Sequence, residues 1–288
     1  MKPPVFRYVA ARSVGEAIDQ LGKADDAKVL AGGQSLTPML NFRLAHPSLL
    51  VDINRIAGLD EIKKDDGGLS IGALVRHYAI EKSAVVNERF PIMTAASTQI
   101  GHLAIRNRGT FGGSIAHADP AAEWPMIAVL LDAEIKTARP GGARKIAAKD
   151  FFVSVMTTAL AQDEILTEVR LPGTPAHTGW GFEELSRRPG DFAIAAVAAL
   201  VTLEKGVCKE ARICLGGVAP MAVRATSAEG ALRGQRLDAA AIQAAADRAR
   251  DAADPSSDVH GSADFRRHLV SVLARRAITK AAERAAQA

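Results

Sequence analysis

Two glycine-rich segments carry residue types that could hold a phosphate group. The first spans residues 30–36 and places Gly32, Gly33, Gln34 and Ser35 directly after a short apolar run. Glycines let backbone N–H groups approach an anion, and the side chains of Gln34 and Ser35 add further donors. An isolated pair of glycines is more often an ordinary tight turn, so this segment alone does not identify a function.

The second segment, residues 109–114, is richer in donors. A pyrophosphate needs several N–H and hydroxyl groups within one turn, and Thr110, Gly112, Gly113 and Ser114 can supply them. Together the two segments could hold the two ends of one dinucleotide. The chain has no Gly-x-Gly-x-x-Gly fingerprint and no Gly-Lys-Thr phosphate loop, which argues against a Rossmann dehydrogenase or a nucleotide hydrolase.

Three residues that follow the second segment have more than one interpretation. His117 could bond to a phosphate or a flavin edge, or it could be a satisfied loop histidine. Asp119 is expected to cap a helix that follows Pro120. Glu123 would lie in the first turn of that helix, where it could accept a ribose hydroxyl or complement the helix dipole. The residues alone favour the dipole role.

No other group of side chains suggests a catalytic or metal site on this chain. The histidines lack ligand spacing with an acidic partner, and no Ser-His-Asp, Cys-His or paired-carboxylate arrangement is evident. Cys208 and Cys214 are the only cysteines, and they lie in a segment that alternates like a strand. They are predicted to share one face at ~20 Å separation, without a disulfide. Two thiolates are also too few for an iron–sulfur cluster or a structural zinc.

These segments need a scaffold of alternating strands and helices. A helix with a capping box is predicted at residues 13–21, because Ser13 is a suitable N-cap and Glu16 stands at the third helical position. Strands are predicted at residues 28–31, 49–53, 68–73, 133–137, 164–171, 193–203 and 210–215. Further helices are predicted at residues 36–44, 78–87, 90–96, 121–131, 224–232, 239–252 and 265–285.

The best internal linker is the segment 171–175, where two prolines and a glycine break structure within a few residues. A lobe boundary is also expected near residue 56, where a second series of strands and helices begins. The chain is therefore predicted to have three lobes, at residues 1–56, 57–174 and 175–288.

Composition and charge exclude several broad classes of protein. The chain has 48% hydrophobic and 24% charged residues, which is ordinary for a globular protein and argues against disorder. Its 36 basic and 32 acidic residues are spread along the whole length, which is typical of a solvated surface and not of a nucleic-acid stripe. The N-terminus has no apolar signal region and no segment is apolar enough to cross a bilayer. We therefore expect a cytoplasmic protein without a membrane span.

With its two glycine segments and several further motifs, the sequence resembles a known family, the FAD-binding medium subunits of the xanthine dehydrogenase and carbon monoxide dehydrogenase group of molybdenum hydroxylases. The resemblance covers essentially the full length, and its motifs occur in the expected order. They are Met1-Lys2-Pro3-Pro4 with Phe6, Ala31-Gly32-Gly33-Gln34-Ser35-Leu36, Ile105-Arg106-Asn107 followed by Thr110-Phe111-Gly112-Gly113-Ser114, Asp119-Pro120-Ala121-Ala122-Glu123, and Arg187-Arg188-Pro189-Gly190-Asp191-Phe192.

The resemblance implies an α+β protein with a PCMH-type FAD-binding fold. Two α/β subdomains would hold an extended FAD between them, and a C-terminal domain of antiparallel sheet and helices would follow. The cofactor-binding residues implied by motif matching are Val29, Leu30, Ala31, Gly32, Gly33, Gln34, Ser35, Leu36, Ile100, Thr110, Phe111, Gly112, Gly113, Ser114, His117, Asp119, Glu123, Leu166, Asp191 and Phe192.

The same resemblance implies a role for each group. Residues 29–36 and 110–114 would wrap the pyrophosphate, and Glu123 stands where the family has an acidic contact to ribose. Ile100 and Leu166 match positions that line the flavin or the adenine. Asp191 and Phe192 match a loop that approaches the isoalloxazine, and a solvated turn before a strand is an equally compatible interpretation.

Three departures from the family pattern affect the expected geometry and acceptor. Phe111 replaces a usual Ile and would narrow the cleft, whereas Ser114 replaces a frequent Asn and can still donate a hydrogen bond. Glu183 lies near the position at which NAD-using members carry Lys. An acidic residue there weakens the case for NAD as the electron acceptor.

The family implies an electron-transfer role without a catalytic residue on this chain. A molybdenum cofactor in a large subunit would hydroxylate the substrate, and [2Fe-2S] clusters in a small subunit would pass electrons to FAD, in a dimer of heterotrimers. The alternatives are a stand-alone PCMH-type flavin oxidase acting on an alcohol or aromatic substrate, and a scaffold that has lost FAD. Such oxidases generally have a larger substrate domain, whereas the C-terminal part here is Ala-rich and poor in polar pocket residues.

Overall fold

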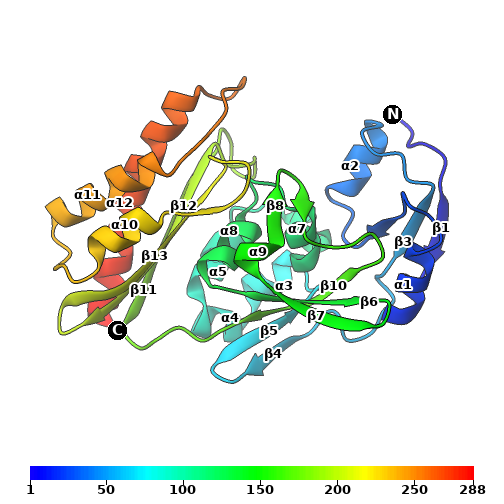
Figure 1. The fold of residues 1–288 in the computed structure, drawn as a ribbon, viewed down its shortest axis with the longest axis horizontal. Coiled ribbons are helices and arrows are strands. Elements are labelled where there is room, and N and C mark those ends of the chain that lie inside the picture. Colours follow the sequence, from blue (N-terminus) through cyan, green and yellow to red (C-terminus); the bar gives the residue numbers. More distant parts are fainter.

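The computed structural model describes residues 1–288 as three lobes that follow one another along the long axis of the molecule (Figure 1). Each lobe is built around one larger sheet, and the chain passes from the N-terminal lobe on the right of the view to the C-terminal lobe on the left. The predicted α+β class is confirmed. On the basis of these sheets we propose that the lobes divide after residues 56 and 174. None of the helices combines the length and the apolarity that a membrane crossing requires.

The first lobe contains a parallel sheet and two short helices. Its strands are β1 (Arg7–Ala10), β2 (Lys28–Leu30) and β3 (Leu49–Asp52), in the order β1-β3-β2, and its helices are α1 (Val14–Leu21) and α2 (Leu36–Asn41). The hydroxyl of Ser13 accepts a hydrogen bond from the N–H of Glu16 at 3.1 Å, and the Glu16 carboxylate accepts from the N–H of Arg12 at 2.8 Å. The predicted capping box is confirmed, with its return bond one residue earlier than the usual pattern.

The second lobe has an antiparallel sheet covered by helices. Its sheet contains β4 (Ile62–Asp65), β5 (Gly68–Gly72), β10 (Ile165–Leu171), β6 (Glu134–Arg139) and β7 (Gly142–Ala147), in that order. Its helices are α3 (His77–Lys82), α4 (Ala84–Arg89), α5 (Pro91–Ser97), α6 (Leu103–Arg108), α7 (Phe111–His117), α8 (Glu123–Leu130) and α9 (Ala148–Phe151), and a separate ribbon pairs β8 (Phe152–Ser154) with β9 (Thr157–Thr158). Every residue of α8 is buried, which makes it the central helix of this lobe.

Several sequence predictions for the second lobe are wrong in detail. The helix predicted at 78–87 is two helices that meet at Ser83, whose hydroxyl caps α4. The helix predicted at 121–131 begins two residues later, at Glu123, and Pro125 is compatible with it because it lies in the first turn, where its missing N–H would have no acceptor. The strands β4 and β7 were not predicted. Both are rich in charged or small residues and are formed by pairing with β5, every residue of which is buried, and with β6, which buries alternate residues.

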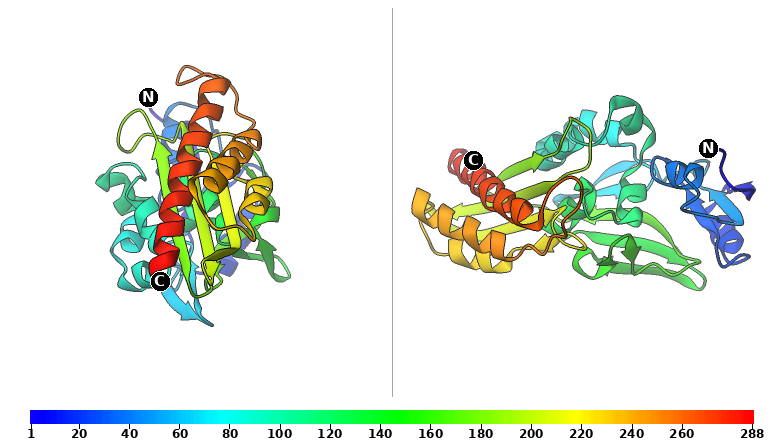
Figure 2. Two further views of the ribbon diagram at one scale, coloured as in Figure 1. Left: turned by 90° about the vertical axis from the view of Figure 1, so that its left-hand side faces the viewer. Right: turned by 90° about the horizontal axis from the view of Figure 1, so that it is seen from above.

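The third lobe has an antiparallel sheet with helices on one face. The strands are β11 (Thr178–Leu185), β12 (Ala195–Glu204), β13 (Val207–Gly216) and β14 (Val223–Arg224), and the helices are α10 (Thr226–Leu232), α11 (Ala239–Asp251) and α12 (Ala263–Gln287). The long helix α12 lies across the sheet (Figure 2). A Cβ at Gly179 or Gly181 would collide with the carbonyl oxygens of Ala281 and Ala277 in α12. Glycine in β11 therefore lets the helix lie directly on the strand, a strand that the sequence did not predict.

The prediction that the two cysteines share one face of a strand is wrong. The register between β12 and β13 shifts, so that Glu210 pairs with Thr202 and Cys208 pairs with Leu203. The residue between them is left over as a bulge, and a bulge reverses the alternation of side chains. Cys208 therefore packs in the core of the third lobe, and Cys214 packs in the core shared with the second lobe. Both thiols are buried and free.

A buried ion pair ties three strands of the second lobe together. Glu164 precedes β10, and its side chain accepts hydrogen bonds from the Arg144 guanidinium at 2.7 and 2.6 Å and from the N–H of Ala161 at 2.9 Å. The hydroxyl of Thr137 donates to the same carboxylate. Although burial opposes the charge, these bonds together lower the pKa of Glu164 to about 2.

Replacing this carboxylate should destabilise the second lobe. Glu164→Ala is expected to lower the free energy of unfolding in urea by about 3 kcal/mol, the lower end for a broken buried pair, because half-buried Arg144 can still reach water. Since the folded-state pKa lies below the usual 4.5, this contribution should be lost as the pH falls from about 4.5 toward 2. The exposed pair Lys209–Glu204 supplies the control, and Glu204→Ala should cost less than about 1 kcal/mol. Equal losses in the two variants would contradict this assignment.

Candidate cofactor site

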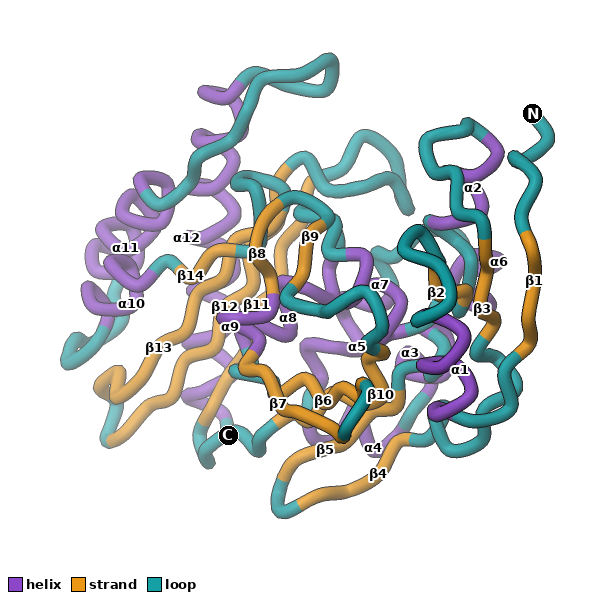
Figure 3. Tube along the Cα trace, turned by 45° about the vertical axis from the view of Figure 1, so that its right-hand side comes forward, coloured by secondary structure: helices purple, strands orange, loops and turns teal.

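The two glycine segments lie against each other where the first lobe meets the second (Figure 3). A Cβ at Gly32 would collide with the carbonyl oxygen of Arg108 and would lie 2.8 Å from the Cα of Gly109. A Cβ at Gly113 would lie 3.8 Å from the Cβ of Ala31. The fold therefore brings together the two segments that the sequence singled out.

The first segment presents a run of free backbone donors. None of the N–H groups of residues 32–36 donates a hydrogen bond to another protein atom, whereas the next one, on Thr37, bonds to the carbonyl oxygen of Gly33 at 3.0 Å. Gly33 has a φ of +71°, a backbone conformation that L side chains rarely adopt. Successive N–H groups that are left free around such a residue form a concave site for an anion. The segment fits a diphosphate.

The second segment is not the donor-rich loop that the sequence predicted. It forms the first turn of α7, in which the N–H of Gly113 donates to the hydroxyl of Thr110 at 3.1 Å and the N–H of Gly112 donates to the carbonyl oxygen of Ala73 at 2.9 Å. The N–H of Ser114 bonds to the carbonyl oxygen of Thr110 at 3.0 Å. The prediction that these N–H groups are available is wrong, because the helix cap, the first helical bond and the bond to Ala73 use them. The side-chain hydroxyls of Thr110 and Ser114 can still donate.

A polar network that the sequence analysis missed connects the segments. The side-chain amide of Asn54 donates to the carbonyl oxygen of Ala31 at 2.8 Å, and its oxygen accepts from Arg76 at 2.8 Å. The same guanidinium donates to the carbonyl oxygen of Arg108. Arg76 thus joins both sides of the contact between lobes. Nothing in the local sequence of either residue indicates this role, since the partners come from distant parts of the chain.

Behind the second segment, a buried histidine holds the central helix in place. The indole N–H of Trp124 donates to Nδ1 of His77 at 2.9 Å. The ring of Phe111 packs edge-on against that indole, with 5.2 Å between the ring centroids. Burial, followed by the nearby charges of Arg76 and Arg106, lowers the pKa of His77 to about 4, so the ring is neutral and can accept this bond. The Phe111 side chain is fully buried here. The expectation that it narrows the cleft is therefore wrong.

The structure also revises the roles expected between α7 and α8. Asp119 accepts a hydrogen bond from the N–H of Ala121 at 2.9 Å, whereas the N-cap of α8 is Ala122. Asp119 therefore stabilises the turn before the helix and does not cap the helix itself. His117 lies in the last turn of α7, which ends at Ala118 in the left-handed region with a φ of +53°.

Glu123 is the first residue of α8, and only 7% of it is exposed. Burial, followed by the negative charge of Glu184 on β11, raises the pKa of Glu123 to about 8. Burial also raises the pKa of Glu184 to about 7. The sequence analysis considered only the first of these carboxyl groups, because β11 was not predicted and nothing in the local sequence places it near α8.

The remaining predicted residues fall into three places. Ile100 and Leu166 are buried in the core of the second lobe. Val29, Leu30 and Ala31 are partly buried at the end of β2 in the first lobe. Asp191 forms an ion pair with Arg187 at 3.8 Å, and Phe192, next to it, is 61% exposed. The turn that contains them rests on the second lobe, because a Cβ at Gly190 would lie 2.9 Å from the carbonyl group of Gly101.

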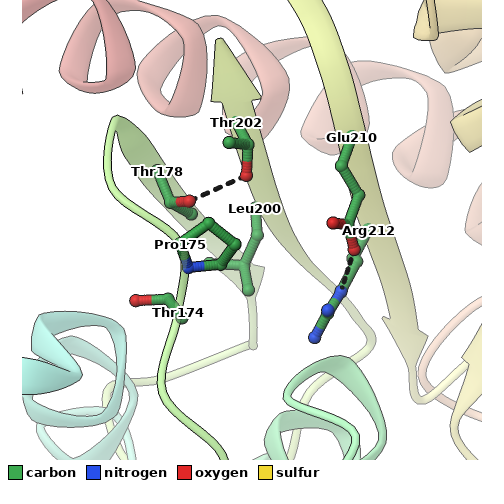
Figure 4. A pocket seen from close by; sticks show the side chains of 7 residues that line it. All are labelled: Thr174, Pro175, Thr178, Leu200, Thr202, Glu210 and Arg212. Carbon is green, nitrogen blue, oxygen red and sulfur yellow. Dashed lines mark hydrogen bonds and ion pairs between the residues drawn. The ribbon is translucent and has the colours of Figure 1, made fainter. Parts of the chain in front are cut away.

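A small pocket lies elsewhere, beside the linker between the second and third lobes (Figure 4). It contains none of the predicted site residues. The side chains that line it are Thr174, Pro175, Thr178, Leu200, Thr202, Glu210 and Arg212. The hydroxyls of Thr178 and Thr202 bond to each other at 2.7 Å, and Arg212 pairs with Glu210 at 2.7 Å, so the polar groups satisfy one another. No group of three or more acidic, histidine or cysteine side chains is arranged to hold a metal ion.

Comparison with known proteins assigns both parts of the chain. Residues 4–174 match the family described as the FAD binding domain in molybdopterin dehydrogenase. Residues 180–281 match the CO dehydrogenase flavoprotein C-terminal domain. The part of the chain that holds the two glycine segments is therefore an FAD-binding domain.

Full-length relatives give the same assignment. The chain is 45% identical over 287 residues to the 6-hydroxypseudooxynicotine dehydrogenase complex subunit alpha of Paenarthrobacter nicotinovorans, covering 99% of this chain and 97% of that subunit. It is 39% identical to the nicotine 6-hydroxylase medium subunit of the same organism, covering 99% and 100%. A chain of the carbon monoxide dehydrogenase from Hydrogenophaga pseudoflava superposes with a TM-score of 0.96 at 40% identity, covering 99% of both chains. This chain belongs to the family of FAD-binding medium subunits of molybdenum hydroxylases.

Gly32 should be essential for the contact between the segments. Gly32→Val would place side-chain atoms where the backbone of residues 108–109 lies, so the two lobes must separate and FAD retention after purification should fall by at least tenfold. Flavin absorbance per protein is the measurement. Gly15→Ala is the matched control, because Gly15 lies in α1 with nothing near its Cβ position, and full flavin content is expected. Normal flavin content in Gly32→Val would refute the proposed role of the contact.

Proposed function

We propose that this chain is the electron-transfer subunit of a heterotrimeric molybdenum hydroxylase. In this proposal its FAD accepts electrons from the [2Fe-2S] clusters of a small partner subunit and passes them to an external acceptor. The observation that carries the proposal is the run of free N–H groups at residues 32–36, held against the backbone of residues 108–109 just before Thr110, in a chain that belongs to this family.

The proposed cofactor contacts follow from the groups that remain available. Residues 29–36 and the hydroxyls of Thr110 and Ser114 would hold the pyrophosphate, since the protein leaves the N–H groups of residues 32–36 and the protons of these two hydroxyls unused. Glu123 would accept a ribose hydroxyl. The other predicted residues would support the FAD-binding surface formed by these groups or lie at its rim. They are Ile100, Phe111, Gly112, Gly113, His117, Asp119, Leu166, Asp191 and Phe192.

In this proposal the protein binds FAD and orients it. When bound, FAD supplies both one-electron and two-electron transfer, which lets it connect single-electron clusters to a two-electron acceptor. Residues 32–36 would fix the diphosphate of the cofactor without a charged side chain, because backbone donors need no reorganisation when the anion arrives. The exposed Phe192 and its turn would limit access from the side of the third lobe.

The partners are proposed from the relatives. The names of the relatives describe subunits of complexes, and that of the Hydrogenophaga pseudoflava structure refers to a molybdenum cofactor. We propose a large molybdenum-cofactor subunit and a small iron–sulfur subunit, arranged as a dimer of heterotrimers. Glu183 is paired with Lys280 of α12 and offers no positive charge to a nicotinamide nucleotide. This residue therefore does not favour NAD as the electron acceptor.

Ser114→Ala separates a cofactor role from a structural one. The hydroxyl of Ser114 makes no hydrogen bond within the protein, so its loss should leave stability unchanged. FAD affinity should fall about tenfold, the effect of one lost hydrogen bond to a charged group. The measurement is quenching of flavin fluorescence on titration of the apoprotein. Ser271→Ala in the third lobe, which removes a hydroxyl bonded to Asp247, should leave affinity unchanged.

Purification together with its partners tests the electron path. Expressed with its partners, the yellow chain should co-purify with iron and molybdenum, and its flavin should bleach only when the substrate of the large subunit is added. Bleaching of the isolated chain by an alcohol or an aromatic substrate would instead identify a stand-alone flavin oxidase. A colourless chain in the intact complex would contradict both functions.

A further inference from the structure

A network of side chains crosses from the first lobe to the second beside the proposed diphosphate site. In the first lobe, Asn54 follows β3, and its side-chain amide donates to the carbonyl oxygen of Ala31 at 2.8 Å. In the second lobe, Arg76 precedes α3 and donates to the side-chain oxygen of Asn54 at 2.8 Å and to the carbonyl oxygen of Arg108. Ala31 and Arg108 each stand one residue before a glycine of the contact between the lobes. The network therefore bridges the two glycine segments next to that contact.

The backbone of Arg76 also lies on the second glycine segment. Arg76 pairs with Thr110 in an isolated antiparallel bridge, in which the N–H of Phe111 donates to the carbonyl oxygen of Val75 at 2.8 Å. Thr110 carries one of the two hydroxyls that we propose for the pyrophosphate. Arg76 is thus connected to both halves of the proposed site, to the second half by its backbone and to the first half through Asn54.

The amide of Asn54 is held in one orientation. Its nitrogen donates to the carbonyl oxygen of Ala31 and to the carboxylate of Asp52, at 2.8 and 2.7 Å, and a reversed amide would set this NH2 group against the guanidinium of Arg76. Asp52 is itself fixed, because it accepts from the N–H of Asn54 at 2.8 Å and from the hydroxyl of Tyr8 at 2.6 Å. The network therefore has a defined geometry from β1 to the end of α6.

Charge pairing does not explain why Arg76 is held here. Both hydrogen bonds of its guanidinium go to uncharged oxygens, those of Asn54 and Arg108. Burial, followed by the positive charge of Arg108, lowers the pKa of Arg76, so its half-buried position disfavours the charged form. A guanidinium nevertheless has one property that suits this place, since its planar fork reaches two acceptors in a fixed geometry.

Cohesion between the two lobes does not depend on this network. Leu74 and Ile165 of the second lobe pack in the core of the first. The side-chain amide of Gln162 also donates to the carbonyl oxygen of Ala27 at 2.8 Å. Ala27 precedes β2, whereas Ala31 follows it, so the two hydrogen bonds hold opposite ends of one strand. Only the end that leads into residues 32–36 is tied to Arg76.

We propose that Arg76 and Asn54 are positioning residues, which set the spacing of the two glycine segments and thereby the affinity for the diphosphate of FAD. This inference rests on the proposed FAD site. The two side chains act through the carbonyl oxygens of Ala31 and Arg108, and the donors of the two segments contact the diphosphate. A site that is held in its binding geometry before the ligand arrives loses less freedom on binding and binds more tightly.

The test is the FAD affinity of the full-length apoprotein, measured by quenching of flavin fluorescence. Arg76→Met removes both bridging bonds and should weaken FAD binding at least ~tenfold, the effect of one lost hydrogen bond to a charged group. Asn54→Ala should have a similar effect. Because the two residues act as one unit, the double variant should lose little more than either single variant. Arg76→Lys keeps the charge but not the planar fork, so it should not restore the affinity.

Gln162→Ala is the matched control. It removes a hydrogen bond between the same two lobes at the opposite end of β2, and it should keep the FAD affinity of the parent. Urea unfolding of the apoproteins measures what each variant costs the fold. A purely structural role of Arg76 predicts that FAD affinity follows this cost in all variants, whereas a positioning role predicts that affinity falls only in the variants of Arg76 and Asn54.

Three results would overturn the inference. They are an equal loss of FAD affinity in Gln162→Ala and Arg76→Met, full affinity in Arg76→Met, and full affinity in Arg76→Lys, which would assign the effect to charge alone. If Arg76→Met does not fold, Asn54→Ala decides in the same way, because that side chain is exposed. A parent that binds no FAD would refute the proposed cofactor site itself, whereas variants that bind like a parent with normal affinity refute only the positioning role.

Discussion

The contact between the backbone of Gly32 and that of residues 108–109 is the constraint on which the rest of the site depends. Two lobes with separate sheets meet here through backbone atoms. A side chain at Gly32 would push the two backbones apart and break the contact. Asn54 and Arg76 donate to carbonyl groups on both sides of it, and the N–H groups of residues 32–36 stay free. Unused donors in a partly buried segment are costly unless a ligand uses them, so the contact both builds the site and favours an anion in it.

A backbone hydrogen bond from Gly217 fastens the third lobe beside α8, and Arg266 holds the segments around Gly217 in place. Arg266 on α12 donates to the carbonyl oxygens of Ile194 and Gly217 at 2.7 and 3.1 Å, and it pairs with Asp258 at 2.8 Å. The N–H of Gly217 in turn donates to the carbonyl oxygen of Pro120 at 2.8 Å, just before α8. The third lobe is therefore anchored at the turn that leads into α8, three residues before Glu123.

Much of the fold was accessible from local pattern. The apolar runs of β2, β3, β5 and β12 and the spacing in α1, α11 and α12 were recognised, because burial on one face imposes a period that survives in the sequence. Strands such as β4 and β7 were not recognised, because their residues have weak strand preference and form strands only by pairing with the more buried β5 and β6. The sequence also could not predict that Cys208 and Cys214 face opposite sides of the sheet. The bulge that reverses the alternation of side chains depends on the pairing of β13 with β12.

By itself, the sequence determined which two segments could bind a phosphate, since glycines and hydroxyl residues record that chemistry directly. Only the tertiary structure decided which of their donors are free. In α7 the fold uses the N–H groups of Gly112 and Gly113, whereas at residues 32–36 it leaves them unpaired. It also brought Asn54 and Arg76, from outside both segments, to the contact between them. Hydrogen-bond satisfaction depends on distances between remote parts of the chain, and the order of residues does not contain those distances.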